Sequence, residues 1–314
     1  METAIYVFSG FLGSGKTLSI QETILKTFTY TGKTSVIICT EEGEYCYRKD
    51  ALKDVGIEVV EVEYKEDFNE AFLERIKKVY DPLNVYIEYN GMWDVEDLIK
   101  MKKPEGWYIE TIFGLVDSTT YSMYLKNMRQ MIMTPLRSAD VVIFNRCDDL
   151  NKGEVRRQLK ILNGRAEVFF IKKDGSVDNN IEDLIFTTEN GILHITDDIF
   201  CSWFVDCLEN SDKYYGKTVR FKGMVTDQLR LMKGQFFLGR KAAICCEADA
   251  SLVGFISELD DSVKDIYKIP SKDDWIEMDA EITKGEVMGN KAIIILKVKK
   301  MEKIETPENE FLYF

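Results

Sequence analysis

Apolar and polar positions along the first part of the chain predict strands and helices in alternation. Six largely apolar runs predict strands, at residues 4–9, 34–40, 84–90, 108–117, 140–145 and 166–172. Amphipathic stretches between them, such as residues 66–80 and 153–163, have the period of helices. Nearly continuous apolar strands separated by helices are typical of a parallel sheet that is covered on both faces. We therefore expect an α/β domain with a mostly parallel sheet over residues 1–195.

The pattern changes after residue 195. Residues 196–210 predict a single helix, which we expect to be a linker. Short runs with turn residues between them then predict strands at 218–226, 234–248, 252–259, 274–285 and 292–304. Because few helices interrupt these strands, residues 211–314 predict a small all-β barrel. Its polar and then aromatic tail, residues 305–314, is expected to dock on the same domain.

Composition narrows the classes of function. The chain has 314 residues, 45% of them hydrophobic, and a net charge of −13. This acidic balance opposes nonspecific binding to nucleic acid or anionic lipid, which requires clustered Lys and Arg. No apolar run approaches the roughly 20 residues of a membrane helix, and we expect no secretory leader before the first strand. Seven cysteines without regular spacing predict no disulfide framework. We expect a cytoplasmic protein that neither binds nucleic acid nor inserts into a membrane.

The stretch GFLGSGKT, residues 10–17, matches G-x-x-x-x-G-K-[ST] and lies between a predicted strand and a predicted helix. Backbone N–H groups of such a loop converge on phosphates, and its glycines let the chain curl around the anion. A lysine in this pattern supplies charge to the β- and γ-phosphate oxygens, and the Ser or Thr offers a hydroxyl to Mg²⁺. The nucleotide-binding residues expected here are Gly10, Gly13, Ser14, Gly15, Lys16 and Thr17.

Two further elements bear on which nucleotide binds. NRCD, residues 145–148, follows a predicted strand at the place where GTPases carry N-K-x-D. The Asp of that element accepts hydrogen bonds from guanine, and Asn145 and Asp148 have its spacing. Arg146 stands where the lysine stem packs on the base, and an arginine can pack in the same way. The element favours GTP over ATP, with an ordinary polar loop as the alternative.

IEYNG, residues 87–91, ends another predicted strand. Glu88 can lie near Mg²⁺ or position a water molecule, and the N–H of Gly91 can meet the γ-phosphate. A strand-end acid that is merely solvated is the alternative.

Together these elements resemble the CobW-like GTPases, an accessory and metallochaperone branch of the P-loop GTPases. The family forms of the elements are similar to residues 10–17, 87–98, 114–121 and 138–150, and its N-E-F-G-E switch region is similar to residues 36–44. The resemblance covers roughly residues 4–190 and implies slow GTP hydrolysis coupled to handling of a transition metal, often zinc or cobalt. It implies Mg²⁺ near Thr17, Glu41 and Glu88, and catalytic roles for Lys16, Glu41 and Glu88. Glu44 would face the nucleotide together with Glu41. Residues 40–44 are called the switch segment below.

One departure concerns the metal cargo. The family usually carries C-x-C-C after the switch region, where thiolates bind a soft metal, but residues 59–68 hold no cysteine. Cys39 and Cys46 could share a metal, although a buried thiol and a loop thiol are the commoner arrangement. The single histidine, His194, is expected at a strand end.

The second domain resembles the soluble, OB-like C-terminal domain of YcgQ-like proteins. The similar stretches are residues 214–227, 236–255 and 273–282. Within them, Cys245 and Cys246 are candidate ligands for zinc or cobalt, with Asp249 nearby. Adjacent residues on a regular strand face opposite ways, so such a site requires a bulge. One core and one partly exposed cysteine is the alternative.

The sequence thus predicts an accessory protein that binds and hydrolyses GTP, with GTP, GDP and Mg²⁺ as ligands, and that acts in zinc or cobalt homeostasis or delivery. The alternative is a metal-free, nucleotide-gated adaptor that docks a permease or a client enzyme. An ATP-using transferase is a third hypothesis. The oligomeric state does not follow from the sequence.

Overall fold

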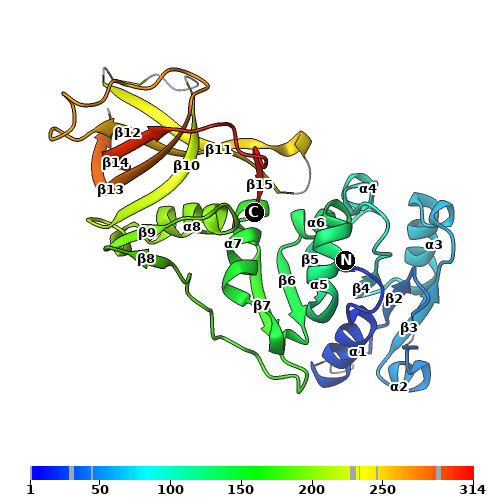
Figure 1. Cartoon of the computed structure of the whole chain (residues 1–314). Coiled ribbons are helices and arrows are strands. Elements are labelled where there is room, and N and C mark those ends of the chain that lie inside the picture. The colour runs from blue at the N-terminus through cyan, green and yellow to red at the C-terminus, as the bar shows by residue number, and fades with distance from the viewer. Residues whose placement is uncertain are drawn as a thin grey trace. The chain divides into compact units, whose positions relative to one another are not determined.

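The structure is a computed structural model that describes residues 2–27, 32–43, 45–226, 231–232, 234–244, 247–287 and 291–314. The chain forms two compact units (Figure 1). The first contains Met1–Lys152 and Leu162–Ile181, and the second contains Gly153–Ile161 and Glu182–Phe314. None of the helices in the described ranges is long and apolar enough to cross a membrane.

A parallel sheet of seven strands forms the centre of the first unit, in the order β3-β2-β4-β1-β5-β6-β7. Its strands are β1 (Thr3–Ser9), β2 (Ser35–Cys39), β3 (Ile57–Glu61), β4 (Asn84–Glu88), β5 (Trp107–Asp117), β6 (Val141–Asn145) and β7 (Glu167–Ile171). The predicted α/β fold with a parallel sheet is confirmed, and β3 is a strand that the sequence pattern did not predict.

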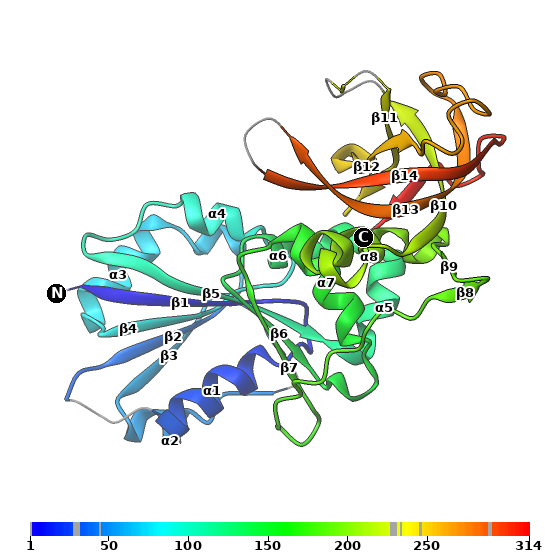
Figure 2. The ribbon, with the colours of Figure 1, turned by 90° about the vertical axis from the view of Figure 1, so that its left-hand side faces the viewer.

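Helices cover both faces of this sheet. They are α1 (Lys16–Thr27), α2 (Lys49–Asp54), α3 (Glu70–Tyr80), α4 (Val95–Lys100), α5 (Ser118–Asn127) and α6 (Arg129–Arg137), with single 3₁₀ turns η1 (Lys65–Asp67) and η2 (Cys147–Asp149). Figure 2 shows α1 and α2 on one face and α3 and α4 on the other. Buried side chains of β1, β2 and α1, such as Phe8, Ile37 and Ile20, pack together in the core. The sheet is therefore buried on both sides, as its continuous apolar strands require.

The register of the parallel strands brings their carboxyl ends to one edge of the sheet. Cys39 at the end of β2 and Phe8 near the end of β1 both pair with Glu88 at the end of β4. Asp117 at the end of β5 pairs with Asn145 at the end of β6. Ligands of open parallel sheets bind at this edge, so the fold gathers the residues that the motifs single out.

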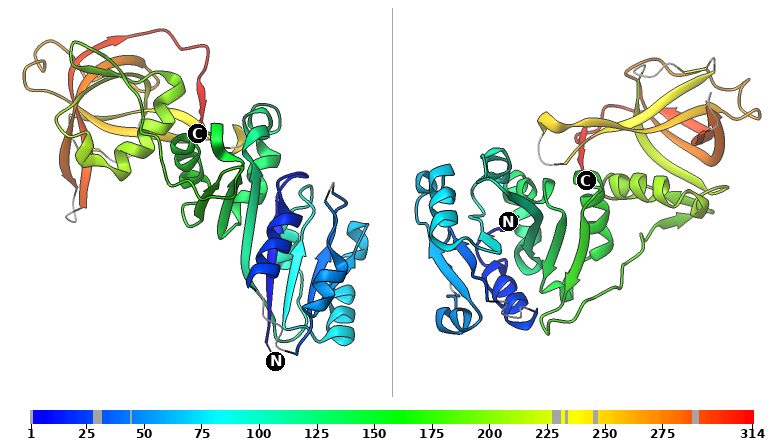
Figure 3. Two further views of the ribbon diagram at one scale, coloured as in Figure 1. Left: turned by 90° about the horizontal axis from the view of Figure 1, so that it is seen from below. Right: turned by 180° about the vertical axis from the view of Figure 1, so that it is seen from behind.

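The second unit is built on a closed barrel of five strands. They are β10 (Thr218–Thr226), β11 (Gln235–Ala243), β12 (Ser251–Leu259), β13 (Trp275–Val287) and β14 (Lys291–Lys303). The ring runs β10-β11-β12-β14-β13 and closes on β10. Figure 3 shows these strands from two further sides. Closure pairs the strands on both sides along much of their length, and it confirms the predicted barrel.

Short elements complete this unit. They are α7 (Lys152–Leu162), β8 (Thr187–Glu189), β9 (Ile192–His194), α8 (Asp197–Glu209), η3 (Ser211–Lys213), η4 (Glu247–Asp249) and β15 (Phe311–Tyr313). His194 ends a strand, as predicted. The tail also docks as predicted, because β15 pairs with β11.

The units divide at other positions than the expected boundaries at 195 and 210. The helix α8, which we expected to be a linker, places Phe200, Trp203 and Cys207 in the same hydrophobic core as Phe221 and Leu238 of the barrel. Burial of these large side chains is worth several kcal/mol, about 1.5–3 kcal/mol each for side chains of this kind. The helix is therefore part of the folded unit, and so is most of α7.

Candidate functional site

The glycine loop connects β1 to α1 and passes close to β5. The backbone of Gly10 has φ +146°, and a Cβ at this position would lie 2.1 Å from the carbonyl oxygen of Leu115. Only glycine fits so close an approach. The helix α1 begins at Lys16, so the loop presents its backbone at a helix N-terminus, where anions bind favourably.

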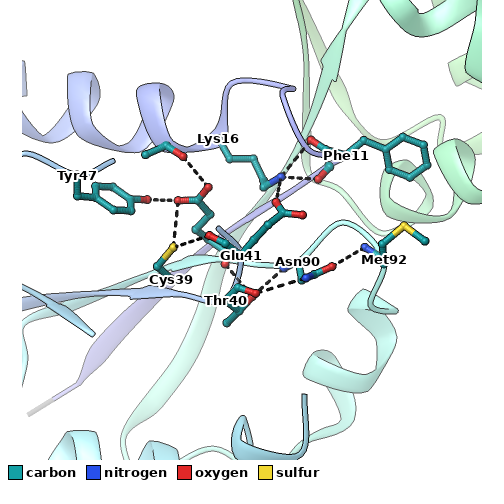
Figure 4. A network of polar contacts seen from close by, with 11 residues as sticks. Phe11, Lys16, Cys39, Thr40, Glu41, Tyr47, Asn90 and Met92 are labelled. Atoms are coloured by element: carbon teal, nitrogen blue, oxygen red, sulfur yellow. Dashed lines mark hydrogen bonds and ion pairs between the residues drawn. The ribbon is translucent and has the colours of Figure 1, made fainter. Parts of the chain in front are cut away.

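Lys16 is buried, with 3% of its surface exposed, and its ammonium group points back at the loop. It donates hydrogen bonds to the carbonyl oxygens of Gly10 at 2.6 Å and Phe11 at 3.1 Å. It also forms an ion pair of 2.5 Å with the carboxylate of Glu41 in the switch segment (Figure 4). A buried ammonium group is stable only with partners of this kind. Two of the three partners of Lys16 belong to the glycine loop, and the third, Glu41, belongs to the switch segment.

Thr17 and Glu88 bring two kinds of oxygen together at the same edge. The Thr17 hydroxyl donates to Glu88 Oε1 at 2.7 Å, although the residues are far apart in the chain. Glu88 is 3% exposed. A hydroxyl beside a carboxylate is an all-oxygen donor set, which suits the hard cation Mg²⁺. The residues present therefore fit this metal.

The other oxygen of Glu88 has partners that no motif predicted. The hydroxyl of Tyr47 donates to Glu88 Oε2, and the Cys39 thiol lies 3.8 Å from the same atom (Figure 4). Burial, and then the Glu88 charge, raise the pKa of the Cys39 thiol to about 12 and also raise the pKa of Tyr47. Both groups stay protonated at neutral pH, so Cys39 is not a thiolate in this state.

The switch segment is bonded to the end of β4. The backbone N–H and the hydroxyl of Thr40 both donate to the Glu88 carbonyl oxygen, at 3.1 and 3.0 Å. The Thr40 hydroxyl in turn accepts from the Asn90 N–H at 2.9 Å. A Cβ on Gly91 would lie 2.2 Å from the Gly10 carbonyl oxygen, so the loop after β4 lies directly against the glycine loop.

Residues of NRCD contact the glycine loop from the other side. The Asn145 side chain donates to the Ser14 carbonyl oxygen at 2.8 Å. Arg146 donates to the Gly13 carbonyl oxygen at 3.1 Å and forms an ion pair of 2.6 Å with Asp117. The arginine at the lysine position therefore ties the loop to the end of β5.

Asp148 lies farther along NRCD and is exposed. Its carboxylate accepts from the backbone N–H of Lys173, just after β7, at 3.0 Å. The turn after β7 thus orients Asp148, which the sequence did not show because only a main-chain group takes part.

A pocket of about 450 Å³ joins several of the predicted residues. Its lining includes Gly13, Gly15, Lys16, Thr17, Glu41, Glu88, Asp117 and Arg146. Gly10, Ser14, Gly91 and Asn145 do not line this pocket but lie in or against the glycine loop, and Asp148 is not part of the lining either. Glu44, Cys245 and Cys246 lie outside the described residues.

Among the described residues, no group of three or more His, Cys, Asp or Glu side chains could hold a metal ion. Cys39 is partly buried and Cys46 is exposed. Within the described residues, Cys39 and Cys46 therefore belong to no such group, whereas Cys245 and Cys246 stay a prediction.

Comparison with known families gives two matches. The family described as CobW/HypB/UreG, nucleotide-binding domain, matches residues 4–170. The family described as DUF1980 C-terminal domain matches residues 172–314. None of the curated proteins compared with the chain matches it. The first match confirms the resemblance drawn from the motifs.

Three of the solved structures that are similar to the chain illustrate the likeness. The hydrogenase maturation factor HypB from Archaeoglobus fulgidus is 18% identical, with a TM-score of 0.38, over 55% of this chain and 82% of that one. A Zn(II)-bound triple mutant of the YjiA GTPase is 17% identical, with a TM-score of 0.43, over 76% and 86%. HypB from Helicobacter pylori in complex with nickel is 14% identical, with a TM-score of 0.37, over 54% and 79%.

Proposed function

The chain belongs to the CobW/HypB/UreG family, and from this premise we propose that it binds GTP and hydrolyses it slowly as an accessory protein in transition-metal handling. One observation carries the nucleotide part. The buried ammonium of Lys16, the Thr17–Glu88 pair and the loop contacts of NRCD meet at a single edge of the parallel sheet. This arrangement supports a phosphate site flanked by a base site.

In the proposed complex, the phosphates lie over the loop from Gly10 to Thr17, where backbone N–H groups and Lys16 neutralise their charge. The N–H of Gly91 is proposed to donate to the γ-phosphate. Asn145 supports the loop, and Asp148 accepts from guanine N1 and N2. Thr17 and Glu88 would hold Mg²⁺, which supplies charge neutralisation at the phosphate oxygens.

Phosphate binding also gives the switch segment its proposed role. Glu41 is an anionic partner of Lys16, and its side chain is 11% exposed. A phosphate oxygen that bonds to Lys16 competes with this carboxylate. Nucleotide binding therefore releases Glu41 from Lys16 and moves the segment, after which Glu41 is free to take the catalytic and Mg²⁺-site role that the resemblance implies.

Zinc or cobalt is proposed as the cargo, on the family resemblance alone. Cys245 and Cys246 remain its candidate ligands. Equilibrium zinc and cobalt binding would be measured on reduced protein loaded with GTP·Mg²⁺ or GDP, beside a Cys245→Ser, Cys246→Ser variant. Stoichiometric metal that depends on these thiols supports delivery of metal. Absence of binding in every state contradicts it and leaves the adaptor that docks a permease or a client enzyme.

The nucleotide part is tested with Lys16→Ala. Loss of the buried charge should weaken binding of a fluorescent GDP analogue at least about 100-fold, because charged hydrogen bonds of this kind contribute about 1.5–3 kcal/mol each. Lys126→Ala, which removes an exposed lysine of α5, is the matched control and should bind as the wild type does. Equal affinity of Lys16→Ala and the wild type would contradict the assignment of the phosphate site.

A further inference from the structure

The carboxylate of Glu88 is shared between two parts of the first unit. Its Oε1 atom accepts from Thr17 of the glycine loop at 2.7 Å, and its Oε2 atom accepts from Tyr47. With 3% of Glu88 exposed, the carboxylate has little access to water. An acid in this position keeps a fixed orientation only if protein donors occupy its oxygens.

The ring of Tyr47 is held independently of its hydroxyl. Tyr47 is 9% exposed and lies in the hydrophobic cluster that contains Phe8, Ile37 and Leu52. Packing therefore fixes the orientation of the ring. The hydroxyl then lies within hydrogen-bond distance of Glu88 without any further rotation of the side chain. Such a preset donor costs little entropy when it makes its bond.

Tyr47 also follows the switch segment closely. Thr40, at the start of that segment, bonds to the Glu88 main chain, while Tyr47, just beyond it, bonds to the Glu88 side chain. Thr40 and Tyr47 are thus both bonded to Glu88. The residue at the end of β4 is a common anchor for the Mg²⁺ site and the switch segment.

We propose that Tyr47 is a positioning residue for the Mg²⁺ site: its hydroxyl holds the Glu88 carboxylate in the orientation in which Glu88 and Thr17 together bind the metal beside the nucleotide. This inference rests on the proposed function. The hydroxyl contacts neither nucleotide nor metal and acts through Glu88. Its loss leaves one oxygen of a buried carboxylate without its main donor, and the carboxylate is then free to rotate away from Thr17.

The test is Tyr47→Phe, which removes only the hydroxyl and keeps the ring in the core. Release of a fluorescent GDP analogue is measured while free Mg²⁺ is varied from none to saturation. The Mg²⁺ concentration that half-maximally slows release should rise about tenfold or more, because a hydrogen bond to a charged group contributes about 1.5–3 kcal/mol. Release without Mg²⁺ should match the wild type, since the loop contacts to phosphate are untouched.

Tyr89→Phe is the matched control. Tyr89 is also buried and adjoins Glu88, but its hydroxyl donates to the Asp94 carbonyl oxygen at 3.1 Å and not to the carboxylate. This variant should keep the wild-type Mg²⁺ dependence. A parallel shift in both variants would mean that loss of any buried hydroxyl disturbs the site, and it would overturn the inference.

The outcomes separate this inference from the proposed function. If the wild type binds no guanine nucleotide or shows no Mg²⁺ effect, the proposed function fails. If the wild type responds to Mg²⁺ and Tyr47→Phe responds at the same concentration, only the role of Tyr47 fails. If Tyr47→Phe loses nucleotide binding even without Mg²⁺, the hydroxyl supports the fold and not the metal site, and the inference is again overturned.

Discussion

A single methyl group added at Gly91, which lies outside the glycine loop, should disturb that loop directly. An added Cβ would lie 2.2 Å from the Gly10 carbonyl oxygen and 2.9 Å from the Cα of Phe11, both of them backbone atoms. Ordinary contact needs about 3.5 Å, so one of the two loops must retreat by about 1 Å. Overpacking of this kind costs about 1–3 kcal/mol. Because the glycine loop is the proposed phosphate cradle, Gly91→Ala should weaken GDP binding about 5- to 150-fold.

The assay is equilibrium binding of a fluorescent GDP analogue in saturating Mg²⁺, with circular dichroism to verify that the variant is folded. Met92→Ala is the control, because Met92 is the next residue in the same loop and is 64% exposed. It should bind as tightly as the wild type. A folded Gly91→Ala protein whose affinity lies within twofold of the wild type would show that the contact with Gly10 does not shape the loop, contrary to this prediction.

Three other changes have expected outcomes. Asp148→Asn should lower GTP affinity at least about tenfold and favour xanthosine triphosphate in competition binding, because an amide no longer matches the guanine N–H donors. Trp203→Ala should lower the stability of the second unit by about 3–5 kcal/mol in urea unfolding, because this side chain is fully buried. Burial alone would raise the pKa of Asp206, but hydrogen bonds, the foremost from Tyr214, lower it overall. Its contribution to stability is complete above the unfolded pKa of about 4 and is lost as pH falls through the lower folded value, so Asp206→Asn should reduce the acid sensitivity of hydrogen exchange in α8.

Much of the fold could be predicted because a buried strand is visible in the sequence as a short run of apolar residues. The central strands of the first unit are largely apolar, whereas β3, at the edge of the sheet, was missed because its short run of Ile57, Val59 and Val60 is interrupted and ended by the acids Glu58 and Glu61. The role of α8 was missed for another reason. A helix with Trp203 at its centre has the same local pattern whether it bridges two domains or enters the core of one, and only tertiary packing decides.

In the candidate site, too, local sequence patterns predict some features, whereas others depend on tertiary contacts. That the glycine loop and NRCD lie at one edge of the sheet could be predicted, because each follows a predicted strand of a parallel sheet. Tyr47 could not, since its partner Glu88 lies 41 positions away and no local pattern links them. The hydrogen bond from the Lys173 backbone N–H to Asp148 could not be predicted either, because a main-chain donor does not depend on the residue type.

Binding of a guanine nucleotide at the edge of the parallel sheet is measured by calorimetric titration of the wild-type chain with GTP and with ATP, each in Mg²⁺. We predict one GTP bound per chain, at least about tenfold tighter than ATP, since a polar site rejects a base that leaves its acceptor unpaired. ATP binding as tightly as GTP, or neither nucleotide binding, would contradict it.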